Sequence, residues 1–91
     1  MPLAFSLQRG QTFTVGPTTY ELHDCRPPHA IVLRRQSYPE RQIDVPYGRV
    51  VEIDPGRTVE ISDRGAFGHR NVRIAVGAPP DEKITRPPAR L

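Results

Sequence analysis

Residues 51–61 read VEIDPGRTVEI, and this stretch contains the clearest fold signal in the chain. The motif VEI occurs twice, at 51–53 and at 59–61, on either side of Pro55-Gly56. Proline fixes φ at the first central position of a turn, and glycine supplies the positive φ that the second central position of a type II turn needs. The two VEI runs are therefore predicted to pair as a β-hairpin.

The same two-residue alternation of apolar and polar residues recurs along the rest of the chain. Such short runs of β-branched and aromatic residues are typical of strands, and they centre on residues 5–7, 13–15, 20–22, 31–33, 43–45, 51–53, 59–61, 72–76 and 84. The 11 prolines and seven glycines interrupt the chain too often for a helical apolar period to persist. The sequence therefore predicts an all-β fold, a small barrel or sandwich of about nine short strands with little or no helix.

An internal repeat is also visible. The matched positions are Phe13 with Val51, Val15 with Ile53, Ile31 with Val72, and Ile43 with Ile84. Two interpretations remain open: short strands resemble one another by chance, or the chain contains two intertwined repeats, residues 4–45 and 46–86, that share one core. In either case we predict a single all-β domain over residues 1–86 and a flexible tail over residues 87–91.

Composition gives a mild indication of the partner. Only 36% of the 91 residues are hydrophobic, so the chain buries a modest core, which favours oligomerisation or a bound partner. The 13 basic residues exceed the 10 acidic ones, and all but Lys83 are arginines, whose planar guanidinium suits phosphates and flat rings. An anionic partner is one explanation of this bias, and codon usage in a GC-rich genome is the other.

Several classes of protein and site are not indicated by the sequence. The single cysteine, Cys25, cannot form a disulfide within the chain, which fits a reducing compartment. No apolar run approaches the roughly 20 residues of a membrane span, and the N-terminus lacks the pattern of a signal peptide, so we expect a cytoplasmic protein with no membrane partner. The spacing of His23, Cys25 and His29 matches no zinc pattern, and no catalytic motif is present. We expect no enzyme activity, no metal and no cofactor.

Residues 72–86, VRIAVGAPPDEKITR, resemble the last two strands of the carbon storage regulator (Csr/Rsm) family, in which V-R-I-G-V-x-A-P precedes a short strand ending in V-x-R. The matching residues are Val72, Arg73, Ile74, Val76, Ala78, Pro79, Ile84 and Arg86. RGQTFTVG at residues 9–16 is similar to the family's second-strand signature, G-E-T-hydrophobic-x-I-G. YGRVVEID at residues 47–54 is a second candidate for the same signature.

The resemblance implies a small bacterial RNA-binding protein. Members of the family are five-stranded, form intertwined homodimers, bind GGA motifs in messenger-RNA hairpin loops and repress translation. They grip RNA where the first strand of one subunit lies beside the last strand of the other. The resemblance therefore implies a homodimer or, if the internal repeat is real, a pseudo-dimer within one chain.

The candidate RNA-binding residues are Gln8, Arg9, Arg70, Arg73 and Arg86. Arg86 matches the last-strand arginine of the family, and Gln8 and Arg9 stand where the family has a basic pair, so one basic residue is replaced. Arg73 lies in the matched fourth strand, and Arg70 lies in the glycine-containing loop before it. Arginine suits RNA because it hydrogen-bonds a guanine edge and stacks on unpaired bases. The alternative for each arginine is an ordinary solvent-facing residue.

The alternative function is a non-enzymatic β-module for protein–protein assembly, such as a phage or secretion structural component, without RNA binding. The missing basic residue at Gln8 favours this alternative. The repeat also places Val45 at the position that matches Arg86, so a second RNA site would lack its arginine. A contiguous arginine face would favour RNA, whereas an exposed apolar patch or an open strand edge would favour a protein partner.

Overall fold

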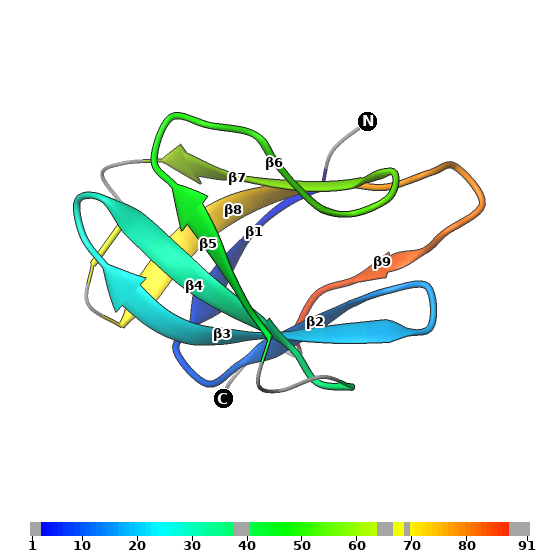
Figure 1. The fold of residues 1–91 in the computed structure, drawn as a ribbon, viewed down its shortest axis with the longest axis horizontal. Helices are drawn as coiled ribbons and strands as arrows, with labels where there is room; N and C mark the ends of the chain where they lie inside the picture. The colour runs from blue at the N-terminus through cyan, green and yellow to red at the C-terminus, as the bar shows by residue number, and fades with distance from the viewer. Residues whose placement is uncertain (1–2, 38–40, 64–66, 69, 88–91) are drawn as a thin grey trace.

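A computed structural model describes residues 3–37, 41–63, 67–68 and 70–87. Nine strands form two antiparallel sheets that face each other (Figure 1). The strands are β1 (Leu3–Gln8), β2 (Thr12–Val15), β3 (Thr18–Arg26), β4 (Ala30–Arg35), β5 (Gln42–Pro46), β6 (Val51–Asp54), β7 (Arg57–Asp63), β8 (Asn71–Gly77) and β9 (Ile84–Thr85). The predicted all-β fold is confirmed, and it is a sandwich, because the two sheets do not close into a barrel. None of the described residues forms a helix that could cross a membrane.

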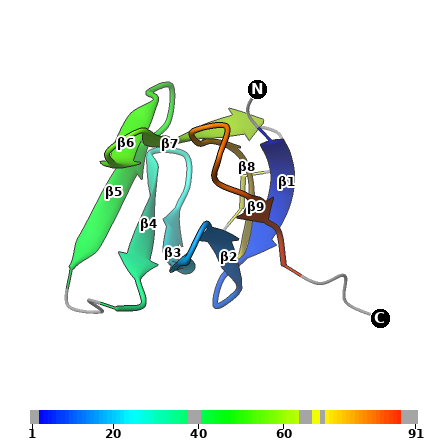
Figure 2. The ribbon, with the colours of Figure 1, turned by 90° about the vertical axis from the view of Figure 1, so that its right-hand side faces the viewer.

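The two sheets combine local hairpins with pairings between distant segments. One sheet has the strand order β1-β8-β7-β6, and the other has the order β5-β4-β3-β2-β9. Strands β2 to β5 and strands β6 to β8 follow one another as antiparallel neighbours, whereas β1 pairs with β8 and β9 pairs with β2. As a result, β1 and β9 lie on one side of the sandwich, and β5 and β6 lie on the other (Figure 2).

The two sheets repeat the same arrangement. Their strand orders become identical when β1 is matched with β5, β8 with β4, β7 with β3, and β6 with β2, and only β9 then has no counterpart. Each half of the chain thus contributes its first strand to the sheet of the other half. In this arrangement β5 is equivalent to β1. The sequence match of Ile43 with Ile84 would instead make β5 equivalent to β9, and the strand orders contradict that match.

The turns after β1 and β5 share one geometry. A glycine with positive φ occupies the third position of each turn, with φ of 92° at Gly10 and 86° at Gly48. In each turn the N–H of the fourth residue donates to the carbonyl of the first, at 2.9 Å after β1 and 3.3 Å after β5. Residues 3–16 therefore correspond to residues 41–54, with a constant offset of 38 positions.

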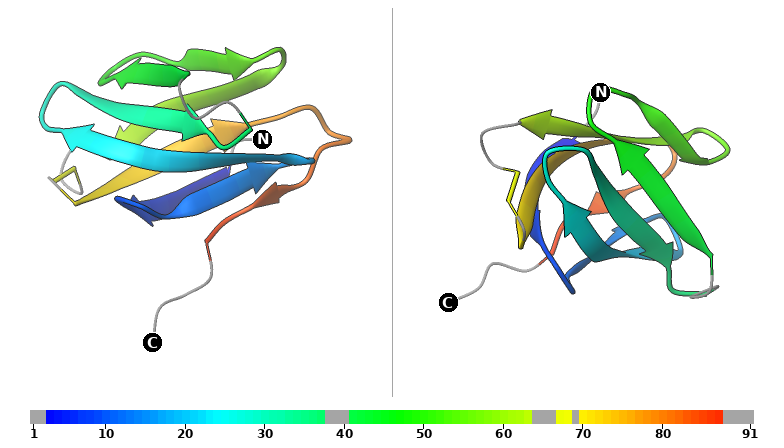
Figure 3. Two further views of the ribbon diagram at one scale, coloured as in Figure 1. Left: turned by 60° about the horizontal axis from the view of Figure 1, so that its bottom comes forward. Right: turned by 60° about the vertical axis from the view of Figure 1, so that its left-hand side comes forward.

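The predicted hairpin at Pro55-Gly56 is present as β6–β7. Gly56 has the positive φ, 76°, that a type II turn requires. An irregularity between Glu52 and Asp54 shifts the register, so that Val51 pairs with Val59 rather than with Glu60. Figure 3 shows this hairpin with β6 at the edge of its sheet. The local sequence signal therefore predicted this turn correctly.

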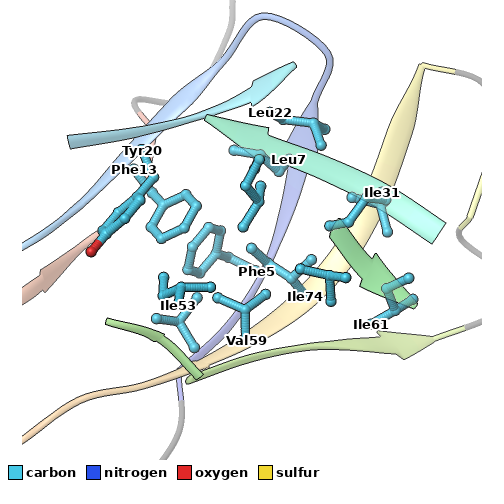
Figure 4. Close-up of a cluster of buried hydrophobic side chains, with 14 of the residues drawn as sticks. Phe5, Leu7, Phe13, Tyr20, Leu22, Ile31, Ile53, Val59, Ile61 and Ile74 are labelled. Atoms are coloured by element: carbon cyan, nitrogen blue, oxygen red, sulfur yellow. The ribbon is translucent and has the colours of Figure 1, made fainter. Parts of the chain in front are cut away.

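The hydrophobic core lies between the sheets and consists of the alternate, inward-facing residues of both. Three aromatic rings form its centre: Phe5 meets Phe13 edge to face at 5.7 Å between ring centroids, and Phe13 stacks on Tyr20 at 5.4 Å. Figure 4 shows these rings among aliphatic side chains contributed by both sheets. Cys25 is also buried in this core. Because strands from both halves supply these side chains, the core is shared between the halves.

Candidate nucleic-acid interface

Four of the polar residues at the end of β1 and the beginning of β8 surround one hollow. Gln8 pairs with Asn71 across the two strands, and the N–H of Arg9 donates to the carbonyl of Arg70 at 2.7 Å. These four residues line a hollow of about 470 Å³, and all four are exposed. We call Gln8, Arg9, Arg70, Asn71 and the adjacent Arg73 the basic face.

Arg73 belongs to this face because of strand alternation. Val72 and Ile74 point into the core, so Arg73 points to solvent, and it pairs with the exposed Ser6 of β1. The Ser6–Arg73 pair lies two positions along the strands from the Gln8–Asn71 pair, on the same outer surface. The structure thus brings together four of the five predicted RNA-binding residues, and the strand register adds Asn71.

Arg86 is placed differently from the prediction. We expected Arg86 and Arg9 on edge strands that pair with each other, but β1 pairs with β8, and β9 pairs with β2 through Thr14 and Thr85. That part of the prediction is wrong. Arg86 follows β9 directly and is exposed, on the side of the sandwich where β1 also lies (Figure 2). No hydrogen bond or ion pair joins Arg86 to the basic face in the described part of the chain.

An acidic residue moderates the charge beside the basic face. Asp24 on β3 lies 3.7 Å from Arg9 and 3.3 Å from Arg26, measured between carboxylate oxygen and guanidinium nitrogen. The hydrogen bond from Arg26 lowers the pKa of the Asp24 carboxyl, with help from the N–H of Cys25. The carboxylate therefore stays ionised at neutral pH, and the trio of Arg9, Asp24 and Arg26 carries one net positive charge. Sequence reasoning missed Arg26 because β3 and β1 belong to opposite sheets, and no local pattern shows which residues of two sheets come close together.

The other side of the sandwich has no second basic face. In the matching backbone position, the N–H of Tyr47 donates to the carbonyl of His29 at 2.8 Å, as Arg9 donates to Arg70. The residues that correspond to the basic face are Pro46, Tyr47, His29, Ala30 and Val32. The described residues therefore offer one such face. The sequence had located the missing arginine at Val45, as the counterpart of Arg86, but that match of β5 with β9 is not the equivalence of the sheets.

A polar cluster that the sequence did not predict connects the two sheets near β9. Arg57, which is 9% exposed, donates two hydrogen bonds to Glu82, at 2.8 Å to Oε1 and 2.5 Å to Oε2. The same guanidinium donates to the hydroxyl groups of Thr18 and Tyr20, at 2.8 and 3.0 Å. Arg57 thereby lowers the pKa of the Glu82 carboxyl. Glu82 lies two residues before β9, which begins at Ile84. The cluster therefore holds the start of β9 against β7 of the opposite sheet.

Tyr20 and Asp54 extend the cluster toward β4. The Tyr20 hydroxyl donates to Asp54, which also accepts a hydrogen bond from Arg35 at 3.2 Å. Burial and the neighbouring Asp54 raise the pKa of the Tyr20 hydroxyl. Asp54 also lies 3.7 Å from Arg57, three residues away, but the other contacts of the cluster join residues 19 to 39 positions apart. No local motif joins these residues, so the cluster could not be predicted from the sequence.

Cys25 does not have the setting of a reactive thiol. Burial raises the pKa of the Cys25 thiol, and its side chain is inside the core, which is opposite to the setting of a reactive cysteine. Within the described residues, no group of three or more His, Cys, Asp or Glu side chains could hold a metal ion. The chemistry that remains at the basic face is hydrogen bonding and charge, which suits binding.

Known proteins offer no match to this chain. No protein-family model matches the chain, and no curated protein or solved structure matches it significantly.

Proposed function

We propose that this protein is an RNA-binding post-transcriptional regulator that uses the basic face to bind unpaired GGA-type sites in messenger RNA and represses translation by occluding them. The observation that carries the proposal is the convergence of Gln8, Arg9, Arg70 and Asn71 around one hollow, with Arg73 on the same surface. These residues come from two segments about 60 positions apart, and the sequence had selected four of the five for this role.

The chemistry of the basic face suits single-stranded RNA. Arginine donates paired hydrogen bonds to the O6 and N7 atoms of guanine, and the amides of Gln8 and Asn71 can read base edges. Unpaired loop bases expose those edges and can also stack on a guanidinium plane. A hollow of about 470 Å³ at the end of two strands gives one or two such bases a place to enter.

The arrangement of strands also supports the proposal. The two halves exchange their first strands, so β1 of the first half and β9 of the second lie on one side of the sandwich. The family that the sequence resembles grips RNA where the first strand of one subunit meets the last strand of the other. In this chain β1 and β9 share one side of the sandwich without pairing with each other, so Arg86 would act as a separate phosphate contact beside β2.

Binding to a GGA-loop RNA hairpin, compared with a loop-scrambled hairpin across a salt series, tests this function. We expect tight binding that depends on the loop and weakens as salt rises, because each phosphate contact with single-stranded RNA contributes about −0.7 to the slope of log K against log salt. Equal binding to both hairpins, or no binding, would contradict the proposal.

Substitutions of single arginines test whether the basic face is the RNA-binding site. Arg73→Gln should weaken binding by about 1–3 kcal/mol if Arg73 reads a guanine edge, or reduce the salt slope by about 0.7 if it contacts a phosphate. Arg49→Gln is the matched control, because Arg49 is exposed and lies in the turn after β5, away from the basic face. An unchanged affinity and slope for Arg73→Gln, or an equal loss for both variants, would exclude the basic face as the site.

The alternative function, a module for protein–protein assembly, is favoured by a different part of the molecule. No strand in the described part of the chain pairs with the outer edge of β6, and an open strand edge was one feature expected of such a module. The two functions use separate residues, so RNA binding at one side does not exclude a protein partner at the other.

A further inference from the structure

The two sides of the sandwich differ by one strand. On one side β9 hydrogen-bonds the outer edge of β2, with Ile84 opposite Val15 and Thr85 opposite Thr14. On the other side β6 holds the place of β2, but no strand among the described residues pairs with its outer edge. The backbone N–H and C=O groups of an open sheet edge form a template for a further strand.

A groove follows this open edge. Its volume is about 450 Å³, and it is lined by Arg35, Arg41, Gln42, Ile43, Glu52, Ile53, Asp54 and Pro55. With the offset of 38 positions, Ile43 and Ile53 correspond to Phe5 and Val15. Ile84 pairs with Val15 and packs against the core to which both residues belong. The groove is therefore the place that β9 fills on the opposite side.

Two exposed apolar side chains lie in the connection between β5 and β6. Val50, directly before β6, is 62% exposed, and Tyr47, in the turn that precedes it, is 39% exposed. No other large apolar side chain among the described residues is exposed. Val50 thus offers an apolar contact at the start of the open edge to a polypeptide that pairs with β6.

The edge of β6 is unsuited to pairing with β6 of a second copy. The strand has only four residues, and its register is irregular between Glu52 and Asp54. An antiparallel pair of two β6 strands would bring Glu52 close to the same residue of the other copy, and like charges opposite each other destabilise a sheet. Of these features, the charge of Glu52 distinguishes the occupants, because it repels Glu52 of a second copy and attracts a strand that carries a cation. The occupant that fits is therefore a different polypeptide.

We propose that the edge of β6 accepts an extended segment of a partner protein, in the position that β9 occupies on β2. The pairing of β9 fixes the expected register: an apolar β-branched residue of the partner lies opposite Ile53, as Ile84 lies opposite Val15. The following residue lies opposite Glu52, where a lysine or arginine complements the exposed carboxylate. The next residue is again apolar and faces Val51. The partner segment is thus a short strand that alternates apolar residues with one cation.

The proposal is tested with two capped peptides, TVKVT and TVEVT, added to the isotope-labelled protein. Chemical shifts and amide hydrogen exchange report where each peptide binds. We expect saturable shifts and slower exchange along residues 51–54, with TVKVT binding about 2–5-fold more tightly than TVEVT because of the charge pair with Glu52. The Glu52→Lys variant should reverse this preference. Glu60→Lys, on the neighbouring strand β7, is the control and should leave it unchanged.

The outcomes separate the proposal from its alternatives. A preference that changes equally in Glu52→Lys and Glu60→Lys would show attraction to the overall charge and would overturn the register. Absence of saturable binding, or binding at the edges of β1, β5 or β9 alone, would overturn the site. Protection of residues 51–54 that increases with protein concentration without peptide would identify a second copy as the occupant and would also overturn the proposal. RNA binding is measured separately, so its failure leaves this result unaffected.

Discussion

Replacing Arg57 by methionine should destabilise the protein more than any other single change at a charged residue described here. Methionine keeps much of the apolar length of the side chain and removes the guanidinium. The substitution leaves the carboxylate of Glu82 without its two hydrogen bonds and deprives the hydroxyl groups of Thr18 and Tyr20 of their donor. Asp54 loses its ion pair with Arg57 at 3.7 Å but keeps its hydrogen bonds from Arg35 and Tyr20, so the larger loss is at Glu82.

The size of the effect follows from the burial of the pair. Removing one partner of a fully buried ion pair costs about 3–5 kcal/mol. The Glu82 side chain is 20% exposed, so water can solvate part of the carboxylate that remains. We therefore expect Arg57→Met to lower the free energy of unfolding by about 2–3 kcal/mol, below the fully buried range. With about 4–8 °C of melting temperature per kcal/mol in a domain of this size, the melting temperature should fall by about 8–24 °C.

Urea unfolding followed by far-ultraviolet circular dichroism at neutral pH measures this loss. Arg49→Met is the control, because Arg49 is exposed and its removal should change the free energy of unfolding by less than about 0.5 kcal/mol. Glu82→Gln should lower stability less than Arg57→Met, since the amide oxygen still accepts one hydrogen bond. A loss for Arg57→Met that equals the loss for the control would refute the reasoning that this cluster holds the sheets together near β9.

Three further predictions concern the same cluster and the core. Arg57 lowers the pKa of the Glu82 carboxyl in the folded protein, so ionised Glu82 stabilises the fold at pH values above about 4.3, the pKa of an unfolded glutamate. This stabilisation is lost as the pH falls through the lowered pKa. Urea midpoints should therefore drop more steeply on acidification in the wild type than in Glu82→Gln, and parallel pH profiles would contradict this. Gly16→Ala should destabilise the protein more than Gly10→Ala in the same assay, although φ of 57° suits alanine better than φ of 92°, because a Cβ at Gly16 would lie 2.8 Å from the Glu82 carboxylate whereas nothing lies within 4 Å at Gly10; equal losses would show that Glu82 moves away freely. The buried thiol of Cys25 should react slowly with a thiol reagent in the native protein and rapidly in urea, and equal rates would place the side chain outside the core.

Much of the fold could be predicted from the sequence because its strands are marked by local patterns. The alternation around Val51 and Val59, with Pro55-Gly56 between, identified a hairpin that the structure contains, although not the irregularity between Glu52 and Asp54 that sets its register. Local patterns do not report which distant strands become neighbours. The pairing of β1 with β8 and of β9 with β2 depends on how two half-sheets exchange strands, and no property of Ile84 alone indicates Val15 as its partner.

Four residues of the basic face could be predicted from the sequence, but the position of Arg86 could not. Arg73 could be assigned to the outer surface because it alternates with inward-facing neighbours, and Gln8 and Arg9 lie at a strand end marked by Gly10. The position of Arg86 depends on which strand β9 pairs with, and no local pattern indicates that strand. The cluster around Arg57 was also out of reach, since buried polar contacts arise from the packing of whole sheets.

The exchange of strands between the halves has a consequence for synthesis on the ribosome. Phe5 of β1 pairs with Ile74 of β8, which is made 69 residues later, and the outer edge of β2 is covered only when β9 has also emerged. At roughly 5–20 residues per second, roughly 3–14 seconds pass between the synthesis of Phe5 and that of its partner Ile74. The apolar residues of β1 remain uncovered by that neighbour during this interval. Neither half of the nascent polypeptide can complete its sheet alone, so both sheets are finished only as the last strands leave the ribosome.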